Sequence, residues 1–116
     1  MLTKSNKDEK EILFGDFVFR PELDVNVTIR RGVKWHGAHG EYIARPSDEN
    51  DKRQQKIRII ATEIYHFMDL PARVIACEHI KECVDYNKLI DAMEKAYDDF
   101  DIRQYVTVVY FCLVGE

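Results

Sequence analysis

Two long runs of β-branched and aromatic residues constrain the fold of this chain more than any other feature. They are residues 57–68, IRIIATEIYHFM, and residues 104–113, QYVTVVYFCL. Branched and aromatic side chains pack well on a pleated surface, so both runs are predicted to be strands. The first run is apolar at both alternating positions. It is therefore expected to be buried on both faces, or to contain a bulge that changes faces midway.

Three shorter segments are predicted to add strands to the same sheet. They are residues 16–19, 25–31 and 41–44. In the second segment, apolar residues alternate with Asn26, Thr28 and Arg30, as in a strand with one buried face. Pro21 and Pro46 follow the other two segments and end them, because proline cannot donate a hydrogen bond to a ladder.

Helical periodicity occurs only late in the chain. After Asp85, a candidate N-cap, apolar residues recur at helical spacing: Tyr86, Leu89, Ile90, Met93, Ala96, Tyr97 and Phe100. This stripe predicts a helix of about four turns, and a shorter helix is expected over residues 72–79. Residues 47–55 contain no apolar side chain and are expected to be an exposed connection, such as a hairpin tip. Strands followed by helices predict an α+β fold: a small β-barrel of five or six mostly antiparallel strands, with one or two helices late in the chain.

The composition indicates one domain. A chain of 116 residues holds one core. We assign the domain to residues 12–116, after a polar tail over residues 1–11 that is expected to be flexible.

No apolar run approaches the roughly 20 residues of a membrane span, and the N-terminus lacks a signal-peptide core. We therefore expect a cytoplasmic protein without a membrane partner. Its three cysteines fit reduced thiols. No metal or other cofactor is expected.

Charge is unevenly distributed along the chain. From residue 25 to 58, eight basic minus four acidic residues gives +4, whereas from 67 to 116 five minus ten gives −5. The basic part includes the candidate nucleic-acid-binding residues Arg30, Arg31, Lys34, Trp35 and His36. Guanidinium and ammonium groups match phosphate oxygens, and an exposed tryptophan stacks on bases. The alternative is a charged surface that prevents an edge strand from pairing with another chain.

The order of the motifs resembles the ASCH group of the PUA-like superfamily, small β-barrels associated with RNA or modified nucleobases. The resemblance rests on Thr28-Ile29-Arg30, Gly32-Val33-Lys34, Phe67-Met68-Asp69-Leu70, and the last helix with its closing strand, Val106–Phe111. It implies a PUA-like β-barrel with a cleft at one end, lined by the Thr-Ile-Arg strand and the loop that follows.

The resemblance also implies candidate catalytic residues. Some bacterial members of the group hydrolyse N4-acetylcytidine with a lysine, a threonine and a glutamate. The threonine corresponds to Thr28, and Val25 stands where those enzymes have the lysine. The glutamate falls in the segment that holds Glu78 and Glu82, and the choice between them is open. The candidate catalytic residues of an enzyme of this kind are Thr28 together with one of Lys34, Glu63, Glu82 or Glu78. Glu63 is a candidate because a carboxylate within an apolar strand lies either on the solvent face or in a cleft.

Three functions follow as hypotheses. The first is an RNA- or nucleotide-binding module that uses the basic rim after the Thr28-Ile29-Arg30 strand. The second is a hydrolase that acts on a modified nucleoside such as N4-acetylcytidine. The third is a protein-interaction module, for example of a phage or mobile element, whose protein partner binds the acidic face over residues 91–101.

Overall fold

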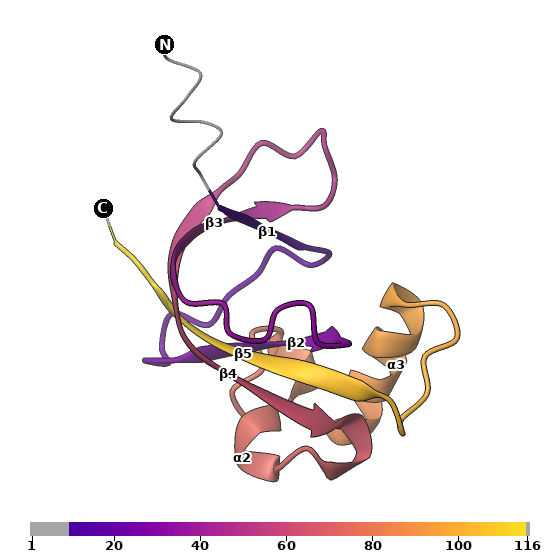
Figure 1. Ribbon diagram of the computed structural model, residues 1–116. Coiled ribbons are helices and arrows are strands. Elements are labelled where there is room, and N and C mark those ends of the chain that lie inside the picture. The colour runs from indigo at the N-terminus through magenta and orange to yellow at the C-terminus, as the bar shows by residue number, and fades with distance from the viewer. Residues whose placement is uncertain (1–9, 116) are drawn as a thin grey trace.

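A five-stranded mixed sheet organises the fold (Figure 1). The computed structural model describes residues 10–115. The strands are β1 (Glu11–Phe14), β2 (Asn26–Arg31), β3 (Gly40–Pro46), β4 (Gln55–His66) and β5 (Tyr105–Leu113), and their order in the sheet is β1-β3-β4-β5-β2. β1 pairs with β3 in parallel, and the other three pairs are antiparallel. The helical elements are η1 (Phe67–Asp69), α2 (Ala72–Ile75), η2 (Lys81–Val84) and α3 (Tyr86–Ala96).

The two long strands predicted from the sequence, β4 and β5, lie side by side in the middle of the sheet. Their register shifts between Ile59 and Ala61, which is the bulge that the apolar run predicted as one of two alternatives. Ile59 on one side of the bulge is buried, whereas Ile60 is 48% exposed. A bulge bends its strand and changes the facing of the residues that follow.

The sheet separates two apolar cores, and β5 contributes to both. On the helical side, Val108 is fully buried with residues of β2, η1, α2 and α3; on the other side, Val109 is fully buried with residues of β1, β3 and β4. Successive side chains of a strand point to opposite faces. The near-continuous apolar sequence of β5 therefore reflects burial on both faces.

The expected barrel is not closed by backbone hydrogen bonds. β1 and β2 are the two edge strands, and no strand pairing joins them anywhere in residues 10–115. The expectation of five or six mostly antiparallel strands with helices late in the chain is confirmed, but the sheet is open. The outer edge of β2 has no further strand beside it, only a short bridge between Val27 and Glu78, which matters for the site described below.

The prediction of a strand over residues 16–19 is wrong. β1 instead occupies Glu11–Phe14, and residues 15–19 form an irregular segment. The aromatic residues that suggested a strand pack against each other, with ring centres 5.0 Å apart for Phe17 and Phe19 and 5.3 Å for Phe14 and Phe19. The tail expected over residues 1–11 lies mostly outside the described residues, and its last residue belongs to β1.

The late helix begins where the sequence predicted and ends sooner. The Asp85 carboxylate accepts hydrogen bonds from the backbone N–H groups of Asn87 (2.8 Å) and Lys88 (3.4 Å), which confirms it as the N-cap. Tyr97 is already extended. The short helix expected over residues 72–79 is only the four residues of α2. Residues 47–54 connect the antiparallel strands β3 and β4 as a hairpin tip, as predicted. No helix within residues 10–115 has the length and apolar character to cross a membrane.

Candidate ligand-binding cavity

A cavity of about 680 Å³ lies along β2 between the end of β1 and α3. In Figure 1 the end of β2 lies below β1 and beside α3. The walls come from β2, from the segment that follows β1, from residues 78–80 and from one side of α3. Elements far apart in the sequence therefore meet at the free edge of β2.

Thr28 and Arg30 line one wall of this cavity from neighbouring positions on one face of β2. The Arg30 Nε donates a hydrogen bond to the Thr28 Oγ1 at 3.2 Å. The Arg30 guanidinium carbon lies 4.7 Å from the ring centre of Phe14 and 6.0 Å from that of Trp35. Cations are attracted to aromatic faces at these distances. The two rings and the threonine therefore fix the direction of the guanidinium.

Arg30 forms no salt bridge with a described carboxylate, although Glu78 acts on its charge from farther away. Across residues 10–115, no Asp or Glu oxygen lies within 4.0 Å of its guanidinium nitrogens. Burial lowers the pKa of Arg30, but a guanidinium stays protonated in proteins. A desolvated cation of this kind is stabilised by a ligand that brings an anionic oxygen or a carbonyl oxygen to it.

Glu78 and His79 form the neighbouring wall, beside the outer edge of β2. The Val27 N–H donates to the Cys77 carbonyl and the His79 N–H donates to the Val27 carbonyl, each at 2.8 Å. This parallel bridge fixes the segment against β2. The Glu78 and His79 side chains are both buried, with 3% and 5% of their surface exposed. The sequence gives no local signal for this burial, because it depends on the long-range bridge to β2.

Burial changes the protonation of both residues. It raises the pKa of Glu78 to about 8, although the Ile80 N–H and the charge of Arg30 oppose the shift. Burial also lowers the pKa of His79 to about 4. The His79 Nδ1 lies 2.8 Å from the Val18 carbonyl oxygen, which only accepts, so Nδ1 carries the proton. The His79 Nε2 is then an acceptor, 3.5 Å from the Glu78 Oε1. At neutral pH both side chains are therefore largely uncharged.

Several residues of the predicted basic rim lie outside the cavity. Arg31 donates from Nη1 to the Asp98 carbonyl at 2.8 Å and lies 5.0 Å from the Tyr97 ring centre, so it anchors the segment after α3. Lys34 and His36 are exposed on the loop that follows β2 and do not line the cavity. Trp35 is half-buried behind Arg30 and packs against Tyr42, with ring centres 5.9 Å apart.

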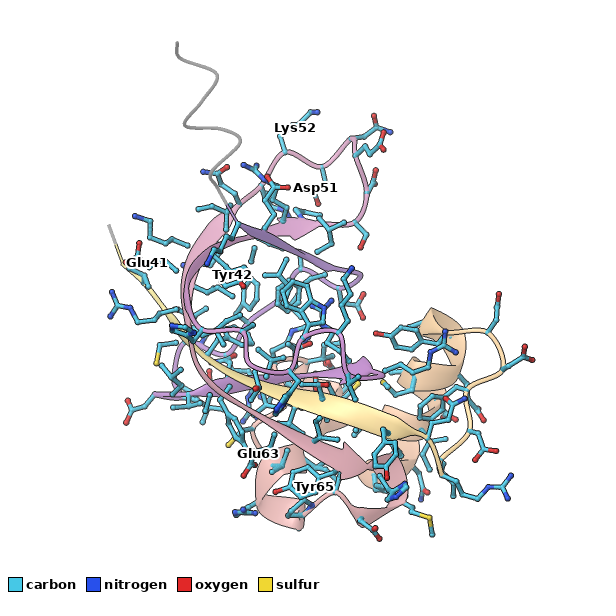
Figure 2. The ribbon with its side chains drawn as sticks, viewed as in Figure 1. Glu41, Tyr42, Asp51, Lys52, Glu63 and Tyr65 are labelled. Atoms are coloured by element: carbon cyan, nitrogen blue, oxygen red, sulfur yellow. The ribbon has the colours of Figure 1, made fainter. Side chains whose placement is uncertain are left out.

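The candidate glutamates are distributed differently. Glu63 lies outside the cavity, where its Oε1 accepts hydrogen bonds from Tyr65 (3.1 Å) and Tyr110 (2.5 Å). Figure 2 shows Glu63 and Tyr65 on β4, near α2. Glu82 is exposed on η2 and lines the mouth of the cavity, whereas Glu78 lies buried in its wall. The structure therefore brings Thr28, Arg30, Glu78 and Glu82 to one cavity and excludes Glu63.

Residues 10–115 form neither a metal site nor a disulfide bond. No group of three or more His, Cys, Asp or Glu side chains in residues 10–115 is arranged to hold a metal ion. The three cysteines are free thiols, which agrees with the expectation from their odd number. No protein-family model, curated protein or solved structure matches this chain.

Proposed function

We propose that this chain binds a nucleotide, either free or exposed in a single-stranded RNA, in the cavity between β2 and α3. The observation that carries the proposal is the Arg30 guanidinium, which is held on two aromatic rings in the cavity wall without an adjacent carboxylate. Phosphate oxygens and the carbonyl oxygens of bases are acceptors that suit a guanidinium. Bases of single-stranded RNA are accessible to such a pocket, unlike those of a duplex.

The size and polarity of the cavity support a single nucleotide as the ligand. Its volume of about 680 Å³ falls within the range of small-molecule sites. The Thr28 hydroxyl accepts from Arg30 and keeps its own proton to donate. The protonated Glu78 carboxyl offers both a donor and an acceptor. Groups of this kind recognise a polar heteroaromatic ring.

The mouth of the cavity favours one nucleotide over a long nucleic-acid track. Two lysines and three exposed carboxylates line it: Lys88, Lys95, Asp16, Glu82 and Asp91. Proteins that follow a single strand without sequence preference use a continuous positive groove. The mixed charges here favour local recognition, with only a weak dependence of affinity on salt.

The fold assignment is part of the same proposal. The order of the motifs resembles the ASCH group of PUA-like barrels, and side chains connect the two edge strands that backbone hydrogen bonds leave open. Arg30 of β2 lies over Phe14 of β1. The sheet is accordingly interpreted as a PUA-like barrel that is completed by side-chain contacts at the cavity.

The test compares Arg30→Ala with Arg58→Ala. Arg58 is an exposed residue of β4 that pairs with Glu41 outside the cavity, so its removal controls for the loss of one charge. Binding of the four ribonucleoside 5′-monophosphates is measured by calorimetry, and binding of a short labelled single-stranded RNA by fluorescence anisotropy at two salt concentrations. A charge-assisted hydrogen bond contributes about 1.5–3 kcal/mol, so Arg30→Ala is expected to weaken binding about 10- to 100-fold.

Arg58→Ala is expected to bind as the unmodified chain does. Equal affinity of the unmodified chain and Arg30→Ala would contradict the proposal, as would the absence of binding to every nucleotide and RNA tested. A steep decrease of affinity with salt would instead indicate several phosphate contacts and would favour the exposed basic rim over the cavity.

A hydrolase that acts on a modified nucleoside is the second candidate, favoured by the position of Glu78. This carboxyl shares the cavity with Thr28, and its pKa of about 8 suits proton transfer near neutral pH. The test is turnover of N4-acetylcytidine by the purified chain. Turnover is expected to disappear in Glu78→Gln and in Thr28→Ala and to persist in Glu82→Gln. No turnover by the unmodified chain would contradict this second candidate.

A further inference from the structure

The outer edge of β2 loses its backbone partner where it meets the cavity. Val27 directs both its N–H and its C=O away from β5, toward Cys77 and His79. In an antiparallel pair, residues two positions apart point their backbone groups to the same side. The N–H and C=O of Ile29 therefore also point away from β5.

The opposite end of β2 gives the same alternation independently. The Gly32 N–H donates to the Tyr105 carbonyl of β5 at 2.9 Å. Arg30 and Thr28, which precede Gly32 by two and four positions, thus direct their backbone groups to β5, opposite Thr107 and Val109. Both ends of the strand place the backbone groups of Ile29 on its free edge.

The segment that pairs with Val27 does not continue to Ile29. After His79 the chain turns at Ile80 into η2, Lys81–Val84. Among the described residues, no backbone or side-chain group outside the β2–β5 pair hydrogen-bonds to the Ile29 N–H or C=O. Ile29 is itself part of the cavity lining. One donor and one acceptor of the main chain are thus left at the cavity wall, beside the Arg30 and Glu78 side chains.

We propose that the Ile29 N–H and C=O recognise the hydrogen-bonding edge of the base in the cavity. This inference rests on the proposed function, and it names the part of the nucleotide that is read. In an extended residue the N–H and the C=O point in one direction. The N–H therefore pairs with an acceptor, and the C=O with a donor, that are adjacent on the edge of a base. Uracil, guanine, cytosine and adenine each carry such an edge. Unpaired main-chain groups in a cavity cost free energy, and a ligand that pairs both removes this cost.

The proposal predicts discrimination against a base whose edge is blocked. The nucleotide that binds most tightly among the four ribonucleoside 5′-monophosphates is compared with its analogue methylated on the ring nitrogen of that edge. This nitrogen is N3 of a pyrimidine or N1 of a purine. A site built to pair a donor and an acceptor rejects an analogue that leaves them unpaired. The methylated analogue is expected to bind at least about tenfold more weakly. Equal affinity would overturn the assignment.

Amide hydrogen exchange of the full chain, measured by NMR, tests the two steps separately. In the free protein, the Ile29 amide is expected to exchange at least about tenfold faster than the amides of Thr28 and Arg30, which bond to β5 and serve as internal controls. Each nucleotide is then added in saturating amount. The nucleotide that binds most tightly is expected to slow exchange at Ile29 by about tenfold or more. The Arg31 amide lies on the same edge beyond the cavity and is expected to keep its rate.

The outcomes separate this inference from the proposed function. Slow exchange of Ile29 in the free protein overturns the inference whatever the chain binds. If a nucleotide binds while the Ile29 amide still exchanges fast, the role of Ile29 is overturned and the proposed function stays intact. If amide exchange slows equally at Ile29 and Arg31, the whole edge of β2 responds to the nucleotide. This result also overturns the proposal that Ile29 itself recognises the base. Failure of all four nucleotides and of the single-stranded RNA to bind overturns the proposed function and, with it, this role of Ile29.

Discussion

Arg30 and Glu78 line neighbouring walls of one cavity, and burial affects the two residues in different ways. A carboxyl group removed from water takes up a proton and becomes neutral, which is why the pKa of Glu78 is raised to about 8. A guanidinium has no such route and stays charged. At the scale of single residues, the cavity therefore places a cation that has no salt-bridge partner near a largely neutral acid.

Protonation of Glu78 makes the stability of the fold depend on pH. The pKa of about 8 in the folded chain lies above the ordinary value of 4.5, so the folded form holds an extra proton between these two pH values. Stability is then highest below the lower value and is lost as pH rises toward the upper one, by at most about 1.4 kcal/mol per pH unit. Urea unfolding between pH 6 and pH 9 is expected to show this loss in the unmodified chain and a smaller one in Glu78→Gln. Parallel curves for the two proteins would contradict the assignment.

His79 has the opposite effect on the acid side. Its pKa is lowered from 6.5 to about 4 in the folded chain, so the unfolded chain binds more protons between these values. Stability is present above pH 6.5 and is lost as pH falls toward 4. Asparagine at this position can keep a donor for the Val18 carbonyl without titrating. His79→Asn is expected to retain more of its stability between pH 6.5 and 4.5 than the unmodified chain does. The measurement is urea unfolding at these two pH values.

At the scale of secondary structure, α3 depends on its N-cap. Asp85 accepts the backbone N–H groups of Asn87 and Lys88, which have no partner within the first turn. Asp85→Ala is expected to lower the free energy of unfolding by about 1 kcal/mol, measured by urea denaturation. Glu94→Ala, an exposed residue of the same helix, is the control and is expected to change stability by less than about 0.5 kcal/mol. Equal effects of the two substitutions would contradict the role of the cap.

The elements whose sequence signal is local could be predicted. β2 and α3 each carry a clear period, whereas β4 and β5 are marked by long runs of β-branched and aromatic residues. Asp85 marks the start of its helix by residue type alone. β1 could not be predicted because Glu11–Phe14 is short, whereas the aromatic residues Phe17 and Phe19 resemble a strand but pack against each other. The bulge in β4 was foreseen as one of two alternatives, because a two-sided apolar run does not specify which one occurs.

The candidate site was predictable to the extent that it lies on one strand. Thr28 and Arg30 follow from the motif on β2, because alternate residues of a strand share a face. Glu78 was only one of two open choices, since its burial depends on the bridge between Val27 and a segment about 50 residues away. Lys34 and His36 follow Arg30 closely in the sequence but lie on a loop outside the cavity. Proximity in sequence was a poor guide once the strand had ended.

At the scale of the whole molecule, tolerance to insertion differs between two exposed connections. Residues 47–54 form a polar hairpin tip, and lengthening such a loop costs little entropy. Four glycine and serine residues inserted between Glu49 and Asn50 are expected to change the free energy of unfolding by less than about 1 kcal/mol. The same insertion between Asp98 and Asp99 interrupts the segment that Arg31 holds against β2, and it is expected to destabilise the chain more. Denaturant unfolding of both variants measures the difference, and equal effects would contradict this expectation.

The central position of β5 has a consequence for synthesis of the chain. β5 follows every other described element in sequence, yet it lies between β4 and β2 and contributes to both cores. β2 has no neighbour in the sheet until residues 105–113 have been synthesised. About 75 residues separate the two strands in the sequence. Pairing between segments so distant in sequence is slow. We therefore expect the cavity between β2 and α3 to be among the last features to form as the protein emerges from the ribosome, and its β2 edge to need protection from other strands until then.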